Sequence, residues 1–254
     1  MSQRPAKTRS PYRLRRSLMW ACLLTIVLAH LGCSDTATRP EASSPSSEAR
    51  LIALFASGEL QPPYSLAYEV QNHLAAIREA YRGTCPFVDS VSFRPNVEPS
   101  FVLLGLDDSA VVAVRDDRYH AWDSLNAQLG ILRINKDSLV RYRRVSLYFR
   151  DLLHPRRLAA LYAHLPGVRY AEPGESGGDG SNVYPRLRGS YPTYLFRKGS
   201  GDCPMGCTSN YYWYFSILPA GPHFVGAWDG IDPPPWWDDA KLNVEEYRTW
   251  MQWP

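Results

Sequence analysis

The chain has 254 residues, of which 45 % are hydrophobic and 21 % are charged, the ordinary composition of a globular protein. Its formal net charge is +3, but residues 1–32 contain six cations and no acid. Removing these six from the 28 cations leaves 22 against 25 acids in residues 33–254. This mildly acidic remainder argues against nucleic-acid binding, which needs a basic surface.

The first 32 residues predict a signal peptide. A basic segment precedes an apolar run over residues 18–32, whose length is marginal for spanning ~30 Å of hydrocarbon. The run leads into His30, Leu31, Gly32 and Cys33, which together resemble a bacterial lipobox. The resemblance implies that Cys33 is lipidated and becomes the new N-terminus, although His30 stands where an aliphatic residue is usual. An uncleaved anchor and a signal cut elsewhere are the alternatives.

The chain behind this signal predicts a tethered, exported protein. Arg15-Arg16 resembles a twin-arginine motif, but arginine pairs are common in ordinary signals, so Sec export is preferred. Residues 33–48 begin with the lipidated cysteine and are rich in Ser, Thr, Pro and Ala without apolar periodicity, which predicts a flexible tether. No later stretch approaches 18 apolar residues. We expect a membrane-anchored lipoprotein of the bacterial cell envelope.

Residues 49–98 predict N-terminal helices followed by a strand. The first helix ends at Gly58, and Pro62 and Pro63 open the second, which stops at Gly83. The alternation of residues 87–93 predicts a strand. One face of the second helix is formed by Leu66, Val70, Leu74, Ile77 and Tyr81.

Residues 99–174 show the clearest order of elements. The order is βαββαβ, so the predicted fold class is α+β, a split βαβ or ferredoxin-like sandwich. Residues 110–114 are read as an extension or partner of the first strand. The predicted elements are a strand at 101–106, a helix within 118–130, strands at 131–135 and 138–150, a helix at 154–167 and a strand at 168–173.

Residues 158–174 resemble the end of the propeptide-inhibitor domain of subtilisin-type proteases. In that family a second helix ends in a Leu-Pro-Gly-Val turn, matched by 165–168, and the last strand runs into Glu-Pro. The resemblance covers about residues 99–174 and implies the same ferredoxin-like order. It also implies a tail that lies in the protease cleft, so Glu172, Pro173, Gly174 and Glu175 are the candidate partner-binding residues. The catalytic signatures of such proteases are absent from the sequence, so the chain is not a protease precursor.

The C-terminal part predicts a linker, a hairpin and a tail. Residues 175–189 are glycine-rich and read as a linker, and 190–254 contain two aromatic-rich strands that form a long hairpin over 190–218. The tail is expected to pack on the same globule, because terminal tryptophans usually pin a segment to its domain. An exposed aromatic face for a glycan or partner protein is the alternative. The tryptophans are Trp236, Trp237, Trp250 and Trp253.

The cysteines of the exported part predict a disulfide rather than a metal or redox site. Export places them in an oxidising compartment, and Cys203 and Cys207 can close a tight turn within the hairpin. A zinc site would need two further ligands, with Asp202 and His223 as candidates, and redox pairs usually have C-x-x-C spacing. Cys85 either pairs with one of the two or remains a buried thiol.

The remaining residues predict neither catalysis nor a cofactor. None of the histidines lies in a nucleophile, base or metal-ligand motif, and the adjacent aspartate pairs are typical of exposed turns. We expect a non-enzymatic protein-binding or protease-inhibitor-like module without catalytic residues, metal or cofactor. Its expected partners are the membrane, through the lipid, and a protease or another envelope protein, but no nucleic acid. A structural envelope lipoprotein without a ligand, and a thiol- or carboxylate-dependent enzyme, are the alternatives.

Overall fold

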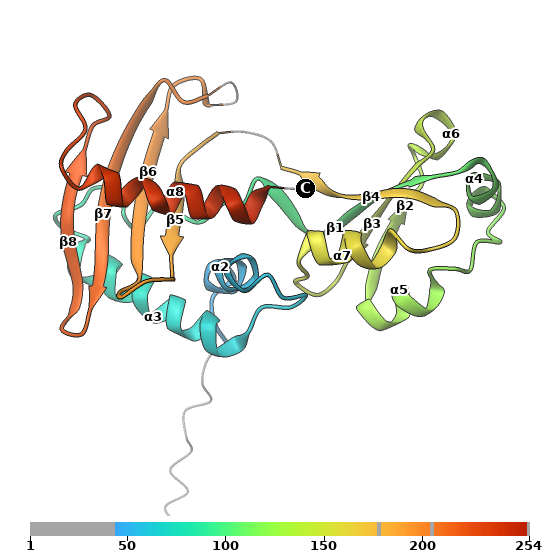
Figure 1. Cartoon of the computed structure of the whole chain (residues 1–254), viewed down its shortest axis with the longest axis horizontal. Helices are drawn as coiled ribbons and strands as arrows, with labels where there is room; N and C mark the ends of the chain where they lie inside the picture. The colour runs from blue at the N-terminus through green and yellow to red at the C-terminus, as the bar shows by residue number, and fades with distance from the viewer. Residues whose placement is uncertain (1–43, 177–178, 204–205, 253–254) are drawn as a thin grey trace, which may run out of the picture. The chain divides into compact units, whose positions relative to one another are not determined.

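The computed structural model describes residues 44–176, 179–203 and 206–252 (Figure 1). The predicted signal peptide, Cys33 and most of the predicted tether lie outside these residues, as does Trp253. The described chain from Pro45 onward forms one unit of mixed α and β structure with two four-stranded antiparallel sheets. We call them sheet A and sheet B, in chain order.

Two helices precede the sheets. Helix α2 (Ser47–Ser57) begins where the Ser46 hydroxyl accepts a hydrogen bond from the Ala49 N–H at 3.3 Å. It ends at Gly58, whose φ of +66° is a left-handed conformation that glycine adopts without strain. Helix α3 (Tyr64–Tyr81) follows Pro63 and buries the apolar face predicted from its spacing.

The strand predicted over residues 87–93 is wrong, because this segment consists of turns and irregular chain. Phe87 has a φ of +70°, which interrupts an extended backbone. The guanidinium of Arg78 donates to the Val88 and Val91 carbonyls at 3.3 and 3.0 Å, and Glu48 accepts from the Phe93 N–H at 2.9 Å. Side chains therefore satisfy the backbone groups that a neighbouring strand would otherwise satisfy.

Sheet A has the strand order β2-β3-β1-β4, with every neighbouring pair antiparallel (Figure 1). Its long central strand β1 starts before the predicted boundary at residue 99 and reaches Leu106. The elements are β1 (Val97–Leu106), α4 (Asp108–Arg115), α5 (Asp123–Leu129), β2 (Ile131–Asn135), α6 (Leu139–Tyr142), β3 (Arg144–Phe149), α7 (Pro155–Tyr162) and β4 (Val168–Glu175).

Two short helices of this region were not expected. The 110–114 segment, predicted as a strand, belongs to α4, because the Asp107 carboxylate accepts from the Ala110 N–H at 2.8 Å and caps a helix there. The predicted strand over 138–150 begins instead with α6, which ends at Arg143 in a left-handed conformation. Both helices connect strands without adding to the sheet.

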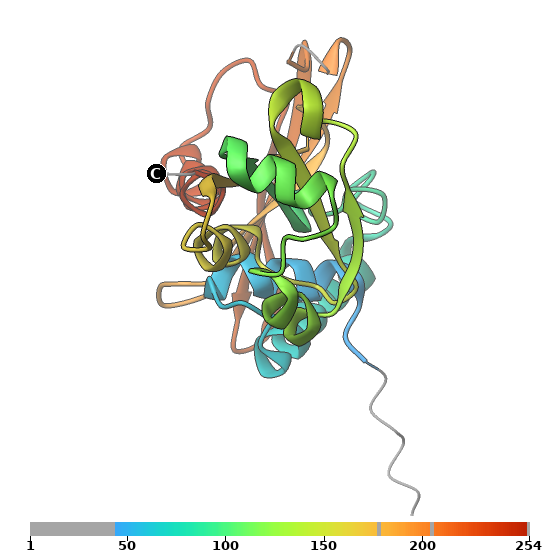
Figure 2. The same cartoon turned by 90° about the vertical axis from the view of Figure 1, so that its right-hand side faces the viewer.

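Sheet A is covered on one face. Alternate residues of β1 and β3 point toward helices α4, α5 and α7, and together they form one hydrophobic cluster. In Figure 1, α7 lies in front of the strands that it contacts. Figure 2 shows the same cartoon turned by 90° about the vertical axis, so that sheet A and its helices face the viewer. The cluster contains Val102, Leu104 and Leu106 of β1, Val145, Leu147 and Phe149 of β3, and Leu158, Ala159 and Tyr162 of α7.

Sheet B is a simple meander with the order β5-β6-β7-β8. Strands β6 and β7 form the predicted hairpin, but two strands and one helix were missed. Strand β5 lies within the predicted 175–189 linker, and β8 and α8 lie within the predicted tail. The elements are β5 (Asn182–Arg186), β6 (Thr193–Ser200), β7 (Ser209–Leu218), β8 (Gly221–Trp228) and α8 (Trp237–Met251).

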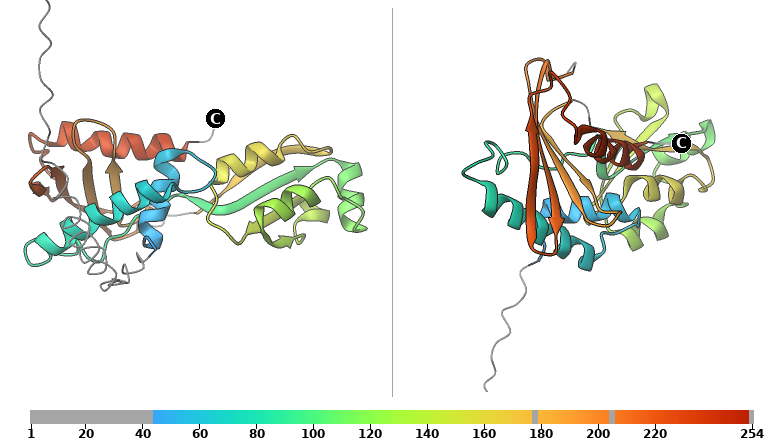
Figure 3. Two further views of the ribbon diagram at one scale, coloured as in Figure 1. Left: turned by 90° about the horizontal axis from the view of Figure 1, so that it is seen from below. Right: turned by 60° about the vertical axis from the view of Figure 1, so that its left-hand side comes forward.

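Helices cover both faces of sheet B, which gives three layers (Figure 3). Helix α3 supplies Tyr81, which contacts Phe215 and Phe224 on one face, and α8 lies against β5 and β6 on the other. Trp250 is buried, and Trp236 and Trp237 pack against the same hydrophobic cluster. Because both faces are covered, the first four residues of β5 and the first four of β6 are all buried.

Candidate functional site

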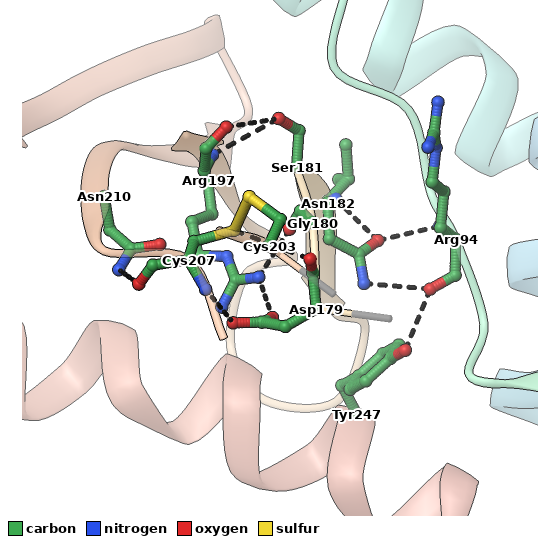
Figure 4. A network of polar contacts seen from close by, with 12 residues as sticks. Arg94, Asp179, Gly180, Ser181, Asn182, Arg197, Cys203, Cys207, Asn210 and Tyr247 are labelled. Atoms are coloured by element: carbon green, nitrogen blue, oxygen red, sulfur yellow. Dashed lines mark hydrogen bonds and ion pairs between the residues drawn. A yellow bond between two sulfur atoms is a disulfide. The ribbon is translucent and has the colours of Figure 1, made fainter. Parts of the chain in front are cut away.

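The predicted disulfide is confirmed between Cys203 and Cys207, in the loop that joins β6 to β7 (Figure 4). Cys85 is a buried free thiol, so the alternative in which it pairs with one of them is wrong. His223, on β8, lies opposite Ser216 of β7. The disulfide loop follows Ser200, at the other end of the hairpin formed by β6 and β7. The structure therefore does not bring His223 to the disulfide.

The disulfide loop holds the chain that connects the two sheets. The Asp179 N–H donates to the Cys203 carbonyl at 3.1 Å, and the Asp179 carboxylate accepts from the Cys207 N–H at 3.4 Å. The guanidinium of Arg197, only 12 % exposed, forms an ion pair with Asp179 and donates to the Gly180 carbonyl. Burial lowers the pKa of Arg197, but the hydrogen bond to Asp179 together with the charges of Tyr184, Asp179 and Tyr212 outweighs burial and leaves the pKa raised.

A second set of hydrogen bonds, next to the contacts of Asp179, joins the start of β5 to the chain that precedes sheet A. The Asn182 side chain accepts from the Arg94 N–H at 2.7 Å and donates to the Arg94 carbonyl at 2.9 Å (Figure 4). The Tyr247 hydroxyl of α8 donates to the same carbonyl at 2.8 Å. Together, these bonds fix the chain just before β1 to the start of β5.

The candidate partner-binding residues lie in a strand. Glu172, Pro173, Gly174 and Glu175 belong to β4, where Glu172 lies opposite Leu103 and Glu175 opposite Val97 of β1. Four residues after Glu175 the chain reaches Asp179, which forms the ion pair with Arg197. These residues are therefore part of a hydrogen-bonded sheet, and of the four only Glu172 is placed with the side chains described next.

The second face of sheet A has no helix packed on it among the described residues. Its side chains alternate with those of the hydrophobic cluster, so they point away from α7. We call this surface the open face. It is formed by Phe101, Leu103, Arg133, Arg144, Tyr148, Tyr170 and Glu172.

Aromatic and arginine side chains on the open face are ordered by mutual contacts. Phe101 and Tyr148 lie opposite each other, with ring centroids 4.9 Å apart in an edge-to-face arrangement. The guanidinium of Arg133 lies 4.1 Å from the centroid of Tyr148. Arg144 donates to the Tyr170 hydroxyl at 2.7 Å. The contacts order these five long side chains before any partner arrives, which lowers the entropy cost of binding.

Glycines allow two of these rings to lie flat on the sheet. The Tyr170 ring covers Gly105, and the Phe101 ring covers Gly174, so closely that a Cβ atom at either glycine would overlap the ring. Partly exposed tyrosines with adjacent arginines, packed over the buried Phe101 ring, have the composition typical of protein-binding hot spots, where Tyr and Arg are enriched.

The histidines and adjacent aspartates that were weighed for catalysis lie at separate places and make structural contacts. Burial lowers the pKa of His73, whose Nδ1 is 3.0 Å from the Tyr194 hydroxyl, and lowers that of His154 to about 4. The adjacent aspartates cap helices or form ion pairs. Asp107 caps α4, and the others pair as Asp108–Arg143, Asp116–Arg118, Asp117–Lys136, Asp238–Lys241 and Asp239–Arg186.

One pocket gathers polar groups between α4, α5 and β2, with a volume of about 210 Å³. His120 contacts Asp123 at 2.8 Å and Lys136 contacts Asp117 at 2.5 Å, so its charged groups already have partners. Within the described residues, no group of three His, Cys, Asp or Glu side chains is arranged to hold a metal ion. The pocket therefore provides a weaker basis for function than the open face.

Comparisons with known proteins give no match: no family model, no curated protein and no solved structure matches the chain. Among the described residues, no helix is both long and apolar enough to cross a membrane. The open face was missed from the sequence, although a signal for it exists. In β3, Arg144, Ser146 and Tyr148 alternate with the apolar residues that face the helices.

Proposed function

We propose that this chain is a membrane-anchored envelope lipoprotein that acts as a non-enzymatic protein-binding module. The observation that carries the proposal is the open face, with its ordered aromatic and arginine side chains. The strand order β2-β3-β1-β4, with helices on one face only, supports a ferredoxin-like sandwich for this part. The resemblance of residues 158–174 to protease propeptides supports a subtilisin-type protease as the partner.

In this proposal, the partner contacts the open face rather than a free tail. Residues Glu172 to Glu175 are paired with β1, and the chain beyond them is held by Arg197 and Arg94. Moving this segment into a protease cleft would break these contacts. Binding through side chains that are already ordered requires no such rearrangement.

The test uses a matched pair of double variants. Y148A/Y170A removes the two tyrosines of the open face, whereas Y64A/Y191A removes two exposed tyrosines outside it, which are 64 % and 48 % exposed. Binding of the wild-type protein to a panel of subtilisin-type proteases is measured at micromolar concentration. We expect Y148A/Y170A to weaken binding at least tenfold and Y64A/Y191A to leave it unchanged. Failure of the wild-type protein to bind or inhibit any of these proteases would remove this partner from the proposal.

The anchor is tested separately. Mass spectrometry of the N-terminal peptide from the membrane fraction is expected to show a lipidated Cys33. The C33A variant is expected to leave the membrane fraction or to keep its signal peptide uncleaved. Detection of an unmodified N-terminus at another position would contradict lipidation while leaving the protein-binding proposal unaffected.

A further inference from the structure

The charges of the chain are unevenly distributed between the two sheets. Residues 97–175, which form sheet A and its helices, contain 11 cations and 10 acids, whereas residues 33–96 and 176–254 together contain 11 cations and 15 acids. Sheet A and its helices are therefore nearly neutral overall, and the rest of the chain behind the signal is acidic. A contact with an anionic surface is consequently argued from local basic segments of this region rather than from its net charge.

One exposed basic segment of this region is the connection between β2 and β3, which contains α6. We call Val140, Arg141, Tyr142 and Arg143 the α6 tip. Val140 is 80 % exposed and Tyr142 is 54 % exposed, although both are large apolar side chains. Arg141 and Arg143 alternate with them, and Arg141 lies with its guanidinium 5.0 Å from the Tyr142 ring centroid.

The backbone of the α6 tip is anchored. Leu139 is only 2 % exposed and joins the hydrophobic cluster of sheet A. The Arg143 N–H donates to the Leu139 carbonyl at 2.9 Å, and the Arg143 carbonyl accepts from the Leu106 N–H at 2.8 Å. The exposure of Val140 and Tyr142 is therefore built into the loop, because the buried Leu139 directs its neighbours outward.

We propose that the α6 tip binds the anionic headgroup surface of the membrane. A tyrosine and an aliphatic side chain suit the boundary between headgroups and hydrocarbon, where amphipathic rings partition favourably. Each arginine near an anionic surface adds electrostatic attraction. Arg141 forms no ion pair with a described residue, and the Arg143–Asp108 pair is exposed on both sides, so it holds Arg143 only weakly.

The inference rests on the proposed anchor, because the anchor makes a weak contact effective. Residues 34–46 connect Cys33 to the first described helix, and thirteen residues span at most ~47 Å when fully extended. A lipid at Cys33 would therefore keep the α6 tip at high effective concentration beside the bilayer. The contact would orient sheet A on the membrane rather than provide the attachment itself.

The test measures binding of residues 45–254, the unit that contains both hydrophobic clusters, to lipid vesicles. Vesicles of phosphatidylglycerol and phosphatidylcholine in equal amounts are compared with pure phosphatidylcholine by sedimentation at low and physiological salt. We expect at least tenfold stronger binding to the anionic vesicles, decreasing as salt rises. Equal binding to both vesicles, or none to either, would overturn the inference.

The variants separate the α6 tip from general charge. R141A/R143N removes both arginines and places Asn, which tolerates a left-handed backbone, at residue 143, where φ is +56°. R82A/R248A removes two exposed arginines elsewhere, one of them also in an exposed ion pair. We expect the first variant to lose at least fivefold in vesicle binding and the second to lose less than twofold, both with wild-type circular dichroism. Equal losses would overturn the inference. Protease binding in these variants reports on the proposed function independently.

Discussion

Sheets A and B each have four antiparallel strands, but they differ in how many faces helices cover. Sheet A buries one face against α4, α5 and α7, and its strand β3 alternates buried and less buried residues. Sheet B lies between α3 and α8, and β6 begins with four consecutive buried residues. We expect the covered sheet to contribute more of the stability and, under the proposed function, the half-covered sheet to contribute side chains for binding. Variants in the two sheets test this division of roles.

The largest stability effect is expected in sheet B. Phe215 is fully buried, and its ring centroid lies 5.2 Å from Tyr81 and 5.5 Å from both Phe196 and Phe224. F215A should lower the free energy of unfolding by about 3–5 kcal/mol, because it removes the ring and leaves a cavity. Urea unfolding with an unchanged m-value measures this loss. Y191A is the control and should change the free energy by less than about 0.5 kcal/mol.

The second effect concerns the attachment of α8 to sheet B. Asn243 is fully buried, and its side-chain amide donates to the Tyr184 and Thr193 carbonyls at 2.8 and 3.0 Å. N243A leaves these acceptors and the Thr193 hydroxyl without their partner, so a loss of about 2–3 kcal/mol is expected. Exposed Glu245 on the same helix is the control, as E245A. Equal unfolding free energies for N243A and E245A would show that α8 is not held by this contact.

The third effect is a pH dependence at His154, which lies between β3 and β4 in the chain and caps α7. Its ring centroid is 5.2 Å from that of Phe55, and its Nδ1 accepts from the Arg156 N–H at 3.3 Å. Burial, followed by the charges of Arg156 and Arg157, lowers its pKa from 6.5 to about 4. His154 therefore binds a proton below about pH 6.5 in the unfolded chain but only below about pH 4 in the folded chain.

Stability should consequently fall as pH decreases through this window. Between pH 7 and pH 5 the linkage amounts to about 2 kcal/mol for this residue. H154N keeps an oxygen that can accept the Arg156 N–H but cannot titrate, so its unfolding free energy should depend less on pH. Parallel pH profiles for the wild-type protein and H154N, measured by urea unfolding, would contradict this assignment.

Sequence patterns predicted some elements of the fold correctly and missed others. Gly58 and the helical spacing from Leu66 to Tyr81 defined α2 and α3, because stop signals and periodicity are local. Strand β8 was missed because its glycines and Pro222 break the alternation typical of strands. Helix α8 was missed because its tryptophans, which follow a proline-rich turn, indicate either packing or an exposed aromatic face and do not by themselves indicate a helix.

The candidate site was harder to predict than the fold. The disulfide followed from spacing and predicted export, but its contacts with Asp179 depend on chain that lies more than 20 residues earlier. The open face depends on which strands are neighbours and which side the helices cover, and both are tertiary properties. The alternation of residues along a strand assigns side chains to two faces of a sheet. It does not tell which of these faces the helices leave uncovered.

The disulfide should have a moderate effect on sheet B. Its loop is short, so C203S/C207S should cost about 2 kcal/mol on the chain-entropy model. The same change should loosen the chain at Asp179, whose N–H donates to the Cys203 carbonyl and whose carboxylate accepts from the Cys207 N–H. Faster hydrogen exchange at the Asp179 and Cys207 amides, with unchanged exchange in sheet A, would localise the effect. Uniformly faster exchange would indicate global destabilisation instead.

The smallest stability effect is expected on the open face. Tyr148 is partly exposed, and its main contacts are the Phe101 ring and the Arg133 guanidinium. Y148A should lower the free energy of unfolding by no more than about 1 kcal/mol, the scale of a cross-strand aromatic pair. If the open face binds a protein, this same variant should produce one of the largest losses in affinity. A Y148A loss as large as that of F215A would mean that Tyr148 belongs to the core of sheet A, and the division between a covered, stabilising sheet and a half-covered, binding sheet would fail.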